Sequence, residues 1–155
     1  MPTASEQDVI RKLQERAARG DVNGIAVTYR VTGGSPAEAI VDEEVALSGE
    51  GLARARARTA VGTMQEASEE LPVADVQALL VELGDAASEL IPRSEARFLP
   101  DSIVGQIRVT IDGQDVSFFF LADDAQASQH GKMMSPKAAV AVDSLMRLHR
   151  RVLQR

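Results

Sequence analysis

The segment that most constrains the fold is residues 106–121, which have the sequence QIRVTIDGQDVSFFFL. Two runs of β-branched and aromatic residues flank Asp112-Gly113, and such a pair favours a two-residue type I′ turn because both central positions need positive φ. The segment is therefore predicted to form a β-hairpin. A turn at this pair also sets the register, in which the facing residues are Ile111 with Gln114, Val109 with Val116, Ile107 with Phe118 and Gly105 with Phe120. The last pair lays an aromatic ring across a glycine, which covers a weak strand position.

The length of 155 residues predicts one globular domain over residues 1–155, large enough to bury about two-thirds of the surface of the unfolded chain. The hydrophobic fraction of 45% and the charged fraction of 26% are ordinary for a soluble protein. No run approaches the roughly 20 apolar residues of a membrane span, and residues 1–20 are charged and helical in pattern, unlike a signal sequence. We therefore expect a cytoplasmic protein without a membrane span.

Two strands are predicted before the middle of the chain. Residues 24–31 alternate apolar and polar side chains, which is typical of a half-buried strand, and residues 38–47 form the second strand. The intervening Thr32-Gly33-Gly34-Ser35 favours a turn. It does not match a phosphate-binding loop, because a strand follows it and no helix N-terminus is available to hold an anion.

Residues 52–58, LARARAR, fit either a strand or a helix, because Ala and Arg are strong helix formers while the alternation has the period of a strand. A three-residue loop over residues 49–51, with Gly51 in the left-handed conformation, favours the strand. It would place two pairs of opposite charge on the solvent-facing side of the sheet, each worth a few tenths of a kcal/mol. The facing residues in that register are Asp42 with Arg58, Glu44 with Arg56 and Leu47 with Ala53.

A first helix is predicted over residues 1–20, with Ser5 and Asp8 as its capping pair and Gly20 as its stop. Its apolar stripe consists of Val9, Ile10, Leu13 and Ala17.

Two more helices follow. One begins at Leu71-Pro72 and ends at Pro92, and the last begins at Ser135-Pro136. The core side of the former comprises Val73, Val76, Leu79, Leu80, Leu83, Leu90 and Ile91, and that of the latter comprises Ala138, Ala141, Val142, Leu145, Leu148 and Val152.

The order of elements is therefore α-β-β-β-α-β-β-α. We expect an α+β fold in which an antiparallel sheet of about five strands, built from two hairpins, packs against the helices. Residues 122–134 are expected to form a polar connecting loop before the last helix.

Candidate catalytic groups are few. Cysteine is absent, which excludes thiolate catalysis and cysteine-ligated metals, and the two histidines show no zinc-type spacing. His149 is expected at a boundary position in contact with water. Asp123, Asp124 and His130 share the polar loop, but no pattern orients them for catalysis, so we expect no catalytic residues, no metal and no cofactor.

Three arginines offer a candidate binding surface. If residues 52–58 are a strand, Arg54, Arg56 and Arg58 project on one face about 7 Å apart and could bind a polyanion or an acidic protein surface, together with Arg30. The alternative is a solvated face in which Asp42 and Glu44 neutralise two of the three. A chain with four Phe and one Tyr has no aromatic platform for nucleic acid, so a nucleic-acid partner is not expected.

The layout of residues 24–155 resembles the emfourin-like bacterial proteins. The resemblance is carried by a first strand that ends in Tyr29-Arg30-Val31-Thr32-Gly33-Gly34, by the Leu71-Pro72 helix start, by the hairpin and by the closing helix. Members of that family include inhibitors of thermolysin-like metalloproteases, so the resemblance implies a protein-binding role. The N-terminal helix, the LARARAR strand and the length of the last helix depart from the family pattern.

The sequence therefore favours a non-enzymatic module that binds another protein, as an inhibitor, an adaptor or an accessory subunit of a larger bacterial assembly. One alternative is a small-molecule-binding domain with a pocket between sheet and helices. An enzyme that uses Asp123, Asp124 and His130 is the less favoured alternative.

Overall fold

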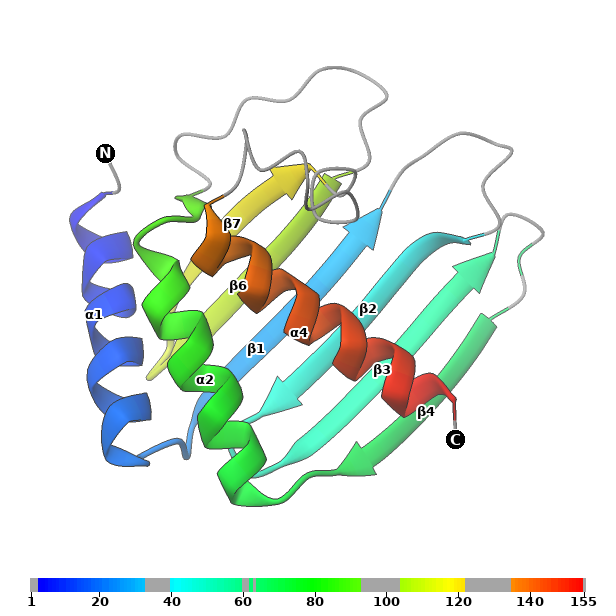
Figure 1. Cartoon of the computed structure of the whole chain (residues 1–155), viewed down its shortest axis with the longest axis horizontal. Coiled ribbons are helices and arrows are strands. Elements are labelled where there is room, and N and C mark those ends of the chain that lie inside the picture. Colours follow the sequence, from blue (N-terminus) through cyan, green and yellow to red (C-terminus); the bar gives the residue numbers. More distant parts are fainter. Residues whose placement is uncertain are drawn as a thin grey trace.

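The structure, a computed structural model, describes residues 3–32, 40–59, 62, 64–92, 104–121 and 135–154 (Figure 1). Along the chain the elements are α1 (Ala4–Arg19), β1 (Ile25–Thr32), β2 (Ile40–Ser48), β3 (Leu52–Thr59), β4 (Met64–Glu70), α2 (Val73–Ala87), β5 (Ile91–Pro92), β6 (Val104–Ile111), β7 (Gln114–Leu121) and α4 (Pro136–Leu153).

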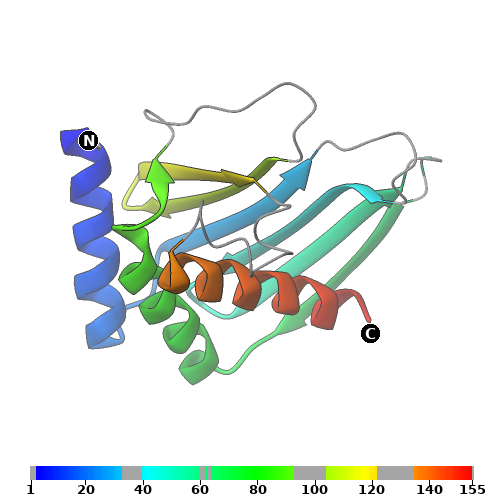
Figure 2. The ribbon, with the colours of Figure 1, turned by 45° about the horizontal axis from the view of Figure 1, so that its top comes forward.

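The strands form one antiparallel sheet in the order β4-β3-β2-β1-β6-β7-β5. The three helices of the described residues lie on one face of it, and α4 crosses the strands from β7 toward β4 (Figures 1 and 2). The predicted α+β class and element order are confirmed. The sheet is larger than predicted, because β4 and the two-residue β5 extend it at its two edges.

The hairpin of β6 and β7 has the predicted turn and register. Asp112 and Gly113 have φ of 52° and 80°, and all four predicted pairs face each other, including Gly105 and Phe120. The ring of Phe120 lies over Gly105, where an added Cβ would come within 2.1 Å of it. The same ring stacks on Tyr29 with the centroids 6.2 Å apart. The glycine therefore makes room for an aromatic pair in the core.

The hairpin turn supplies the first test. Replacing Gly113 with valine should destabilise the fold by about 1 kcal/mol or more, because a β-branched side chain is forced to positive φ. An added Cβ at this position has no atom within 4 Å, so the cost is conformational and not a clash. The matched control is Gly113→Asn, since asparagine tolerates the left-handed region. Equal losses for the two variants in urea denaturation would contradict a type I′ turn.

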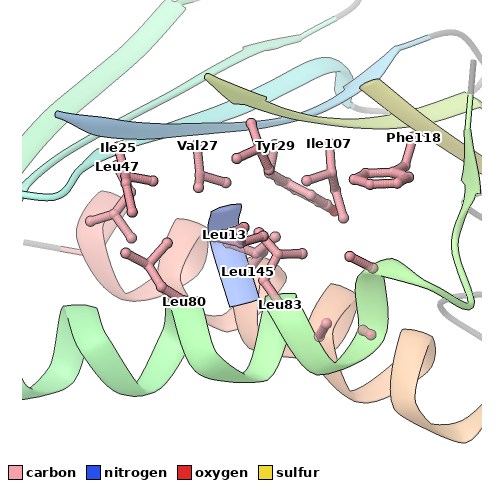
Figure 3. Packing of buried hydrophobic residues seen from close by; sticks show 14 of the residues in the cluster. Leu13, Ile25, Val27, Tyr29, Leu47, Leu80, Leu83, Ile107, Phe118 and Leu145 are labelled. Carbon is pink, nitrogen blue, oxygen red and sulfur yellow. The ribbon is translucent and has the colours of Figure 1, made fainter. Parts of the chain in front are cut away.

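The hydrophobic core lies between the sheet and the helices (Figure 3). Inward side chains of β1, such as Val27 and Tyr29, point toward Leu13 of α1, Leu83 of α2 and Leu145 of α4. All of the core residues predicted for α1 and α4 are buried. The prediction for α2 holds in part: Val73 is 59% exposed, Leu79 is partly buried, and the buried members are Val76, Leu80, Leu83 and Leu90.

Two helix boundaries differ from the prediction. The capping box of α1 uses Thr3 and Glu6, two residues earlier than the Ser5 and Asp8 pair expected from the sequence. Helix α2 ends at Ala87, not at Pro92, because Ile91–Pro92 pairs with β7 as a short edge strand. Proline is tolerated there, since an edge position does not need its missing N–H.

The alternation of β3 follows from what covers it. Its alanines, Ala53, Ala55 and Ala57, are buried under α4, while the arginines between them are exposed on the other face. The small side chains let α4 approach the strand closely, and the strand assignment of residues 52–58 is confirmed.

His149 of α4 is buried, which corrects the expected water-contacting position. Its Nε2 lies 2.9 Å from the backbone carbonyl oxygen of Arg56. The imidazole approaches β3 from the side on which the alanines lie. A carbonyl only accepts, so Nε2 carries the hydrogen and donates it. Nδ1 lies 3.9 Å from a carboxylate oxygen of Glu43. The histidine therefore attaches α4 to the backbone of β3.

Candidate functional site

The candidate site lies on the sheet face opposite the three helices, over β1 to β4. Arg54, Arg56 and Arg58 project from β3 onto this face, as the alternation predicts, and all three are exposed. Arg30 projects onto the same face from β1, because residues 25, 27 and 29 take the buried side. The structure thus brings the four predicted binding residues to one surface.

The predicted register of β2 and β3 is confirmed, with Asp42 facing Arg58 and Glu44 facing Arg56. The ion pairs follow it only in part. Arg56 binds Glu44, with Nη2 2.5 Å from Oε2. Asp42 is instead held by Arg30, whose Nε and Nη2 lie 3.2 Å and 3.1 Å from its two carboxylate oxygens. These hydrogen bonds from Arg30 to Asp42 raise the pKa of the guanidinium above its ordinary value.

The Arg30 ion pair leaves two cations available. Within the described residues, neither Arg54 nor Arg58 forms an ion pair, because Asp42 is occupied by Arg30 and the cross-strand neighbours of Arg54 are Ala46 and Ser68. Arg54 is the more isolated of the two, since both of its neighbours are small and uncharged. Half of the predicted arginine set therefore remains able to bind a carboxylate.

A shallow hollow of about 550 Å³ lies beside Arg54. It spans β2, β3 and β4, and its charged and polar lining consists of Glu44, Arg54, Arg56, Glu66 and Ser68. The small side chains of Ala46 and Ser68 make the depression, because longer ones would fill the space between the arginines. The sequence did not indicate this hollow.

Glu66 belongs to the site and was missed because β4 was missed. The segment Met64–Glu70, MQEASEE, has no alternation of apolar residues and is rich in helix formers, so nothing in it indicates a strand. Gln65, Ala67 and Glu69 lie on the helix side of the sheet, opposite the three alanines of β3. Of these only Glu69 is buried, with one oxygen 3.0 Å from Nη2 of Arg151 in α4. Pairing with β3 and this ion pair override the local sequence.

Four charges of alternating sign lie side by side across the four strands. Arg30, Glu44, Arg56 and Glu66 are successive cross-strand neighbours on β1, β2, β3 and β4. In this row each interior charge has an opposite charge on both sides, which stabilises the face modestly. The row ends at the sheet edge on Glu66, for which the described residues provide no ion pair.

The described part of the chain contains no group of three His, Asp or Glu side chains placed to hold a metal ion. His149, the one histidine described, is engaged with the β3 backbone on the helix side and does not reach the arginine face. Asp123, Asp124 and His130, considered above for catalysis, lie outside the described residues. What the described site can do chemically is bind charged groups through guanidinium and carboxylate side chains.

No protein-family model matches the chain, and no curated protein is significantly similar to it in sequence. Among the described helices, none is both long enough and apolar enough to cross a membrane.

Proposed function

We propose that the chain is a non-enzymatic protein-binding module, acting as an inhibitor, an adaptor or an accessory subunit of a bacterial assembly. The observation that carries the proposal is the exposed pair of arginines on β3, Arg54 and Arg58, which have no ion pair within the described structure and flank an Arg56 that is already paired. A guanidinium group binds a carboxylate through two parallel hydrogen bonds. The preferred ligand is therefore an acidic segment of another protein.

The charge of the whole chain supports a protein over a nucleic acid as the partner. The net charge is −6, and the cations of the site are interleaved with Asp42, Glu44 and Glu66. A surface of mixed sign repels a uniform polyanion but can match a protein surface that has both charges. The emfourin-like layout is consistent with this role and makes a metalloprotease one partner class to test.

A double variant tests the proposal. Arg54→Glu with Arg58→Glu should weaken capture of the partner from an extract of the source organism by about tenfold or more, since two exposed ion pairs contribute about 1 kcal/mol each and reversed charges repel. The matched control is Arg11→Glu with Arg147→Glu. It changes the net charge by the same amount as the test variant, but on helices α1 and α4 instead of the arginine face. Equal capture by wild type and the Arg54/Arg58 variant would refute the proposal.

A small-molecule-binding domain is the second candidate, and the volume of the hollow favours it. The 550 Å³ beside Arg54 lies within the usual range of about 300–1,000 Å³ for ligand pockets. Its lining is mostly charged, however, whereas such pockets are predominantly apolar. Native mass spectrometry of the protein purified from its source separates the two: a retained small molecule supports this candidate, and a stoichiometric protein supports the first.

A further inference from the structure

The edge strand β4 has backbone groups directed away from the sheet. In the described structure β4 pairs only with β3. The N–H of Leu71 donates to the carbonyl of Gly51, which makes the neighbouring pair of Leu52 and Glu70 a non-hydrogen-bonded one. Because the two kinds of pair alternate along an antiparallel ladder, Glu66 and Ser68 turn their N–H and C=O groups to the outer side. These groups form a template for one more strand.

The side chains of the same residues restrict what that strand can be. Glu66 ends the row of alternating charges, so the next residue in the row must be basic. Ser68 lies between Arg54 and the edge, and its small side chain leaves Arg54 free to extend over it toward an acidic residue on an added strand. That residue would be two strand spacings from Arg54, about 10 Å, a gap that an arginine and a glutamate span together. Met64 at the end of β4 is 49% exposed and favours an apolar neighbour.

We propose that the partner binds as an extended strand added antiparallel to β4, with an acidic, a basic and an apolar residue at alternate positions in that order. The acidic residue lies opposite Ser68 and bonds Arg54, the basic residue lies opposite Glu66, and the apolar residue lies opposite Met64. Main-chain hydrogen bonds supply affinity and the three side chains supply specificity. This proposal rests on the proposed protein-binding function. It adds that the bound segment of the partner is extended and has a defined charge pattern.

The charges at the β4 edge favour binding of a strand with this particular charge pattern over binding of any extended strand. Exposed edges are commonly protected by charged side chains, which repel uncomplementary strands. Glu66 and Arg54 lie in adjacent cross-strand rows with opposite signs, so a strand with the reverse order of charges would meet like charges at both positions. The edge therefore selects a partner strand by the order of its charged residues and not by its net charge.

Two synthetic peptides of identical composition test the order. One carries Glu-Thr-Lys-Thr-Leu at its centre, and the other carries Lys-Thr-Glu-Thr-Leu in the same flanking sequence. The first should bind at least about tenfold more tightly, since two attractive pairs replace two repulsive ones. Amide chemical shifts in an isotope-labelled sample measure the affinity, and the largest changes should occur at residues 64–70. Equal affinities for the two peptides would overturn the proposal.

Two protein variants separate the charge pattern from the backbone mode. Arg54→Glu with Glu66→Lys should reverse the preference between the peptides, and a preference that stays unchanged would overturn the proposal. Ser68→Pro removes an outward N–H but no hydrogen bond to β3, and it should abolish binding of the first peptide. Each variant is first checked for an unchanged melting transition.

The strand mode and the protein-binding function can fail separately. If the Arg54→Glu and Arg58→Glu variant loses the native partner while Ser68→Pro retains it, the arginines bind the partner and the strand mode is wrong. If the arginine variant retains the native partner, the protein-binding function itself is wrong at this face, whatever the peptides do.

Discussion

Replacing Gly49 with alanine is expected to destabilise the fold by about 3 kcal/mol or more. Gly49 lies in the loop between β2 and β3, and its N–H donates to the carbonyl of Ile25 at 2.7 Å. A Cβ at this position would lie 1.6 Å from the carbonyl oxygen of Val22, which is a backbone atom and cannot move aside alone. The substitution must therefore displace either the β2–β3 loop or the α1–β1 connection.

Gly24→Ala is the control for this prediction. Gly24 has φ of 80°, but an added Cβ there has no neighbour within 4 Å, so the expected loss is only about 1 kcal/mol from backbone strain. Chemical denaturation of the two variants measures the difference directly. If Gly49→Ala is no more destabilising than Gly24→Ala, the close approach of the two loops is wrong.

A second large effect is expected at alkaline pH. Burial raises the pKa of the Tyr29 phenol above its ordinary value, the nearby Glu43 carboxylate raises it further, and Arg150 offsets part of the increase. Above about pH 10 the unfolded chain releases this proton while the folded chain keeps it. The free energy of unfolding should therefore fall as pH rises, by about 1.4 kcal/mol per pH unit until the folded phenol also ionises.

Tyr29→Phe isolates this contribution, since phenylalanine has no proton to lose. Above about pH 10, the free energy of unfolding of the wild type should fall steadily relative to that of Tyr29→Phe. The chain contains one Tyr and no Trp, so the ultraviolet absorbance of phenolate reports this group alone. A phenolate signal at the ordinary pKa of about 10 while the protein is still folded would contradict the burial of Tyr29.

The sequence predicted those parts of the fold in which the conformation preferred by the local residues is the one found in the folded protein. Asp112-Gly113 specifies its turn through backbone conformation alone, and the register of β6 and β7 follows. The register of β2 and β3 followed from Gly51, whose φ of 108° is the positive value that the loop required. Alternating alanine and arginine then placed the β3 side chains on the correct faces.

The parts that were missed depend on contacts distant in sequence. Strand β4 is held by β3 and by the Arg151–Glu69 ion pair from α4, and its own residues indicate no strand. The burial of His149 depends on small residues in β3 beneath it, which the periodicity of α4 does not reveal.

The candidate site was predicted in composition but not in detail. The four arginines share one face, but the pairing of Asp42 with Arg30, reached diagonally across β1 and β2, required side-chain geometry. That pairing decides which arginines remain available. Glu66 and the hollow beside Arg54 could not be predicted until β4 was placed at the edge.

The claim that the arginine face binds a protein is tested most directly by arginine-specific chemical labelling of the free chain and of its complex with the captured partner. Mass spectrometry of the phenylglyoxal-treated samples gives the reactivity of each arginine. We predict that Arg54 and Arg58 react freely in the isolated chain and become protected in the complex, while Arg11 and Arg147 on the helix side react equally in both. Protection confined to the helix-side arginines, with Arg54 and Arg58 unchanged, would contradict the account.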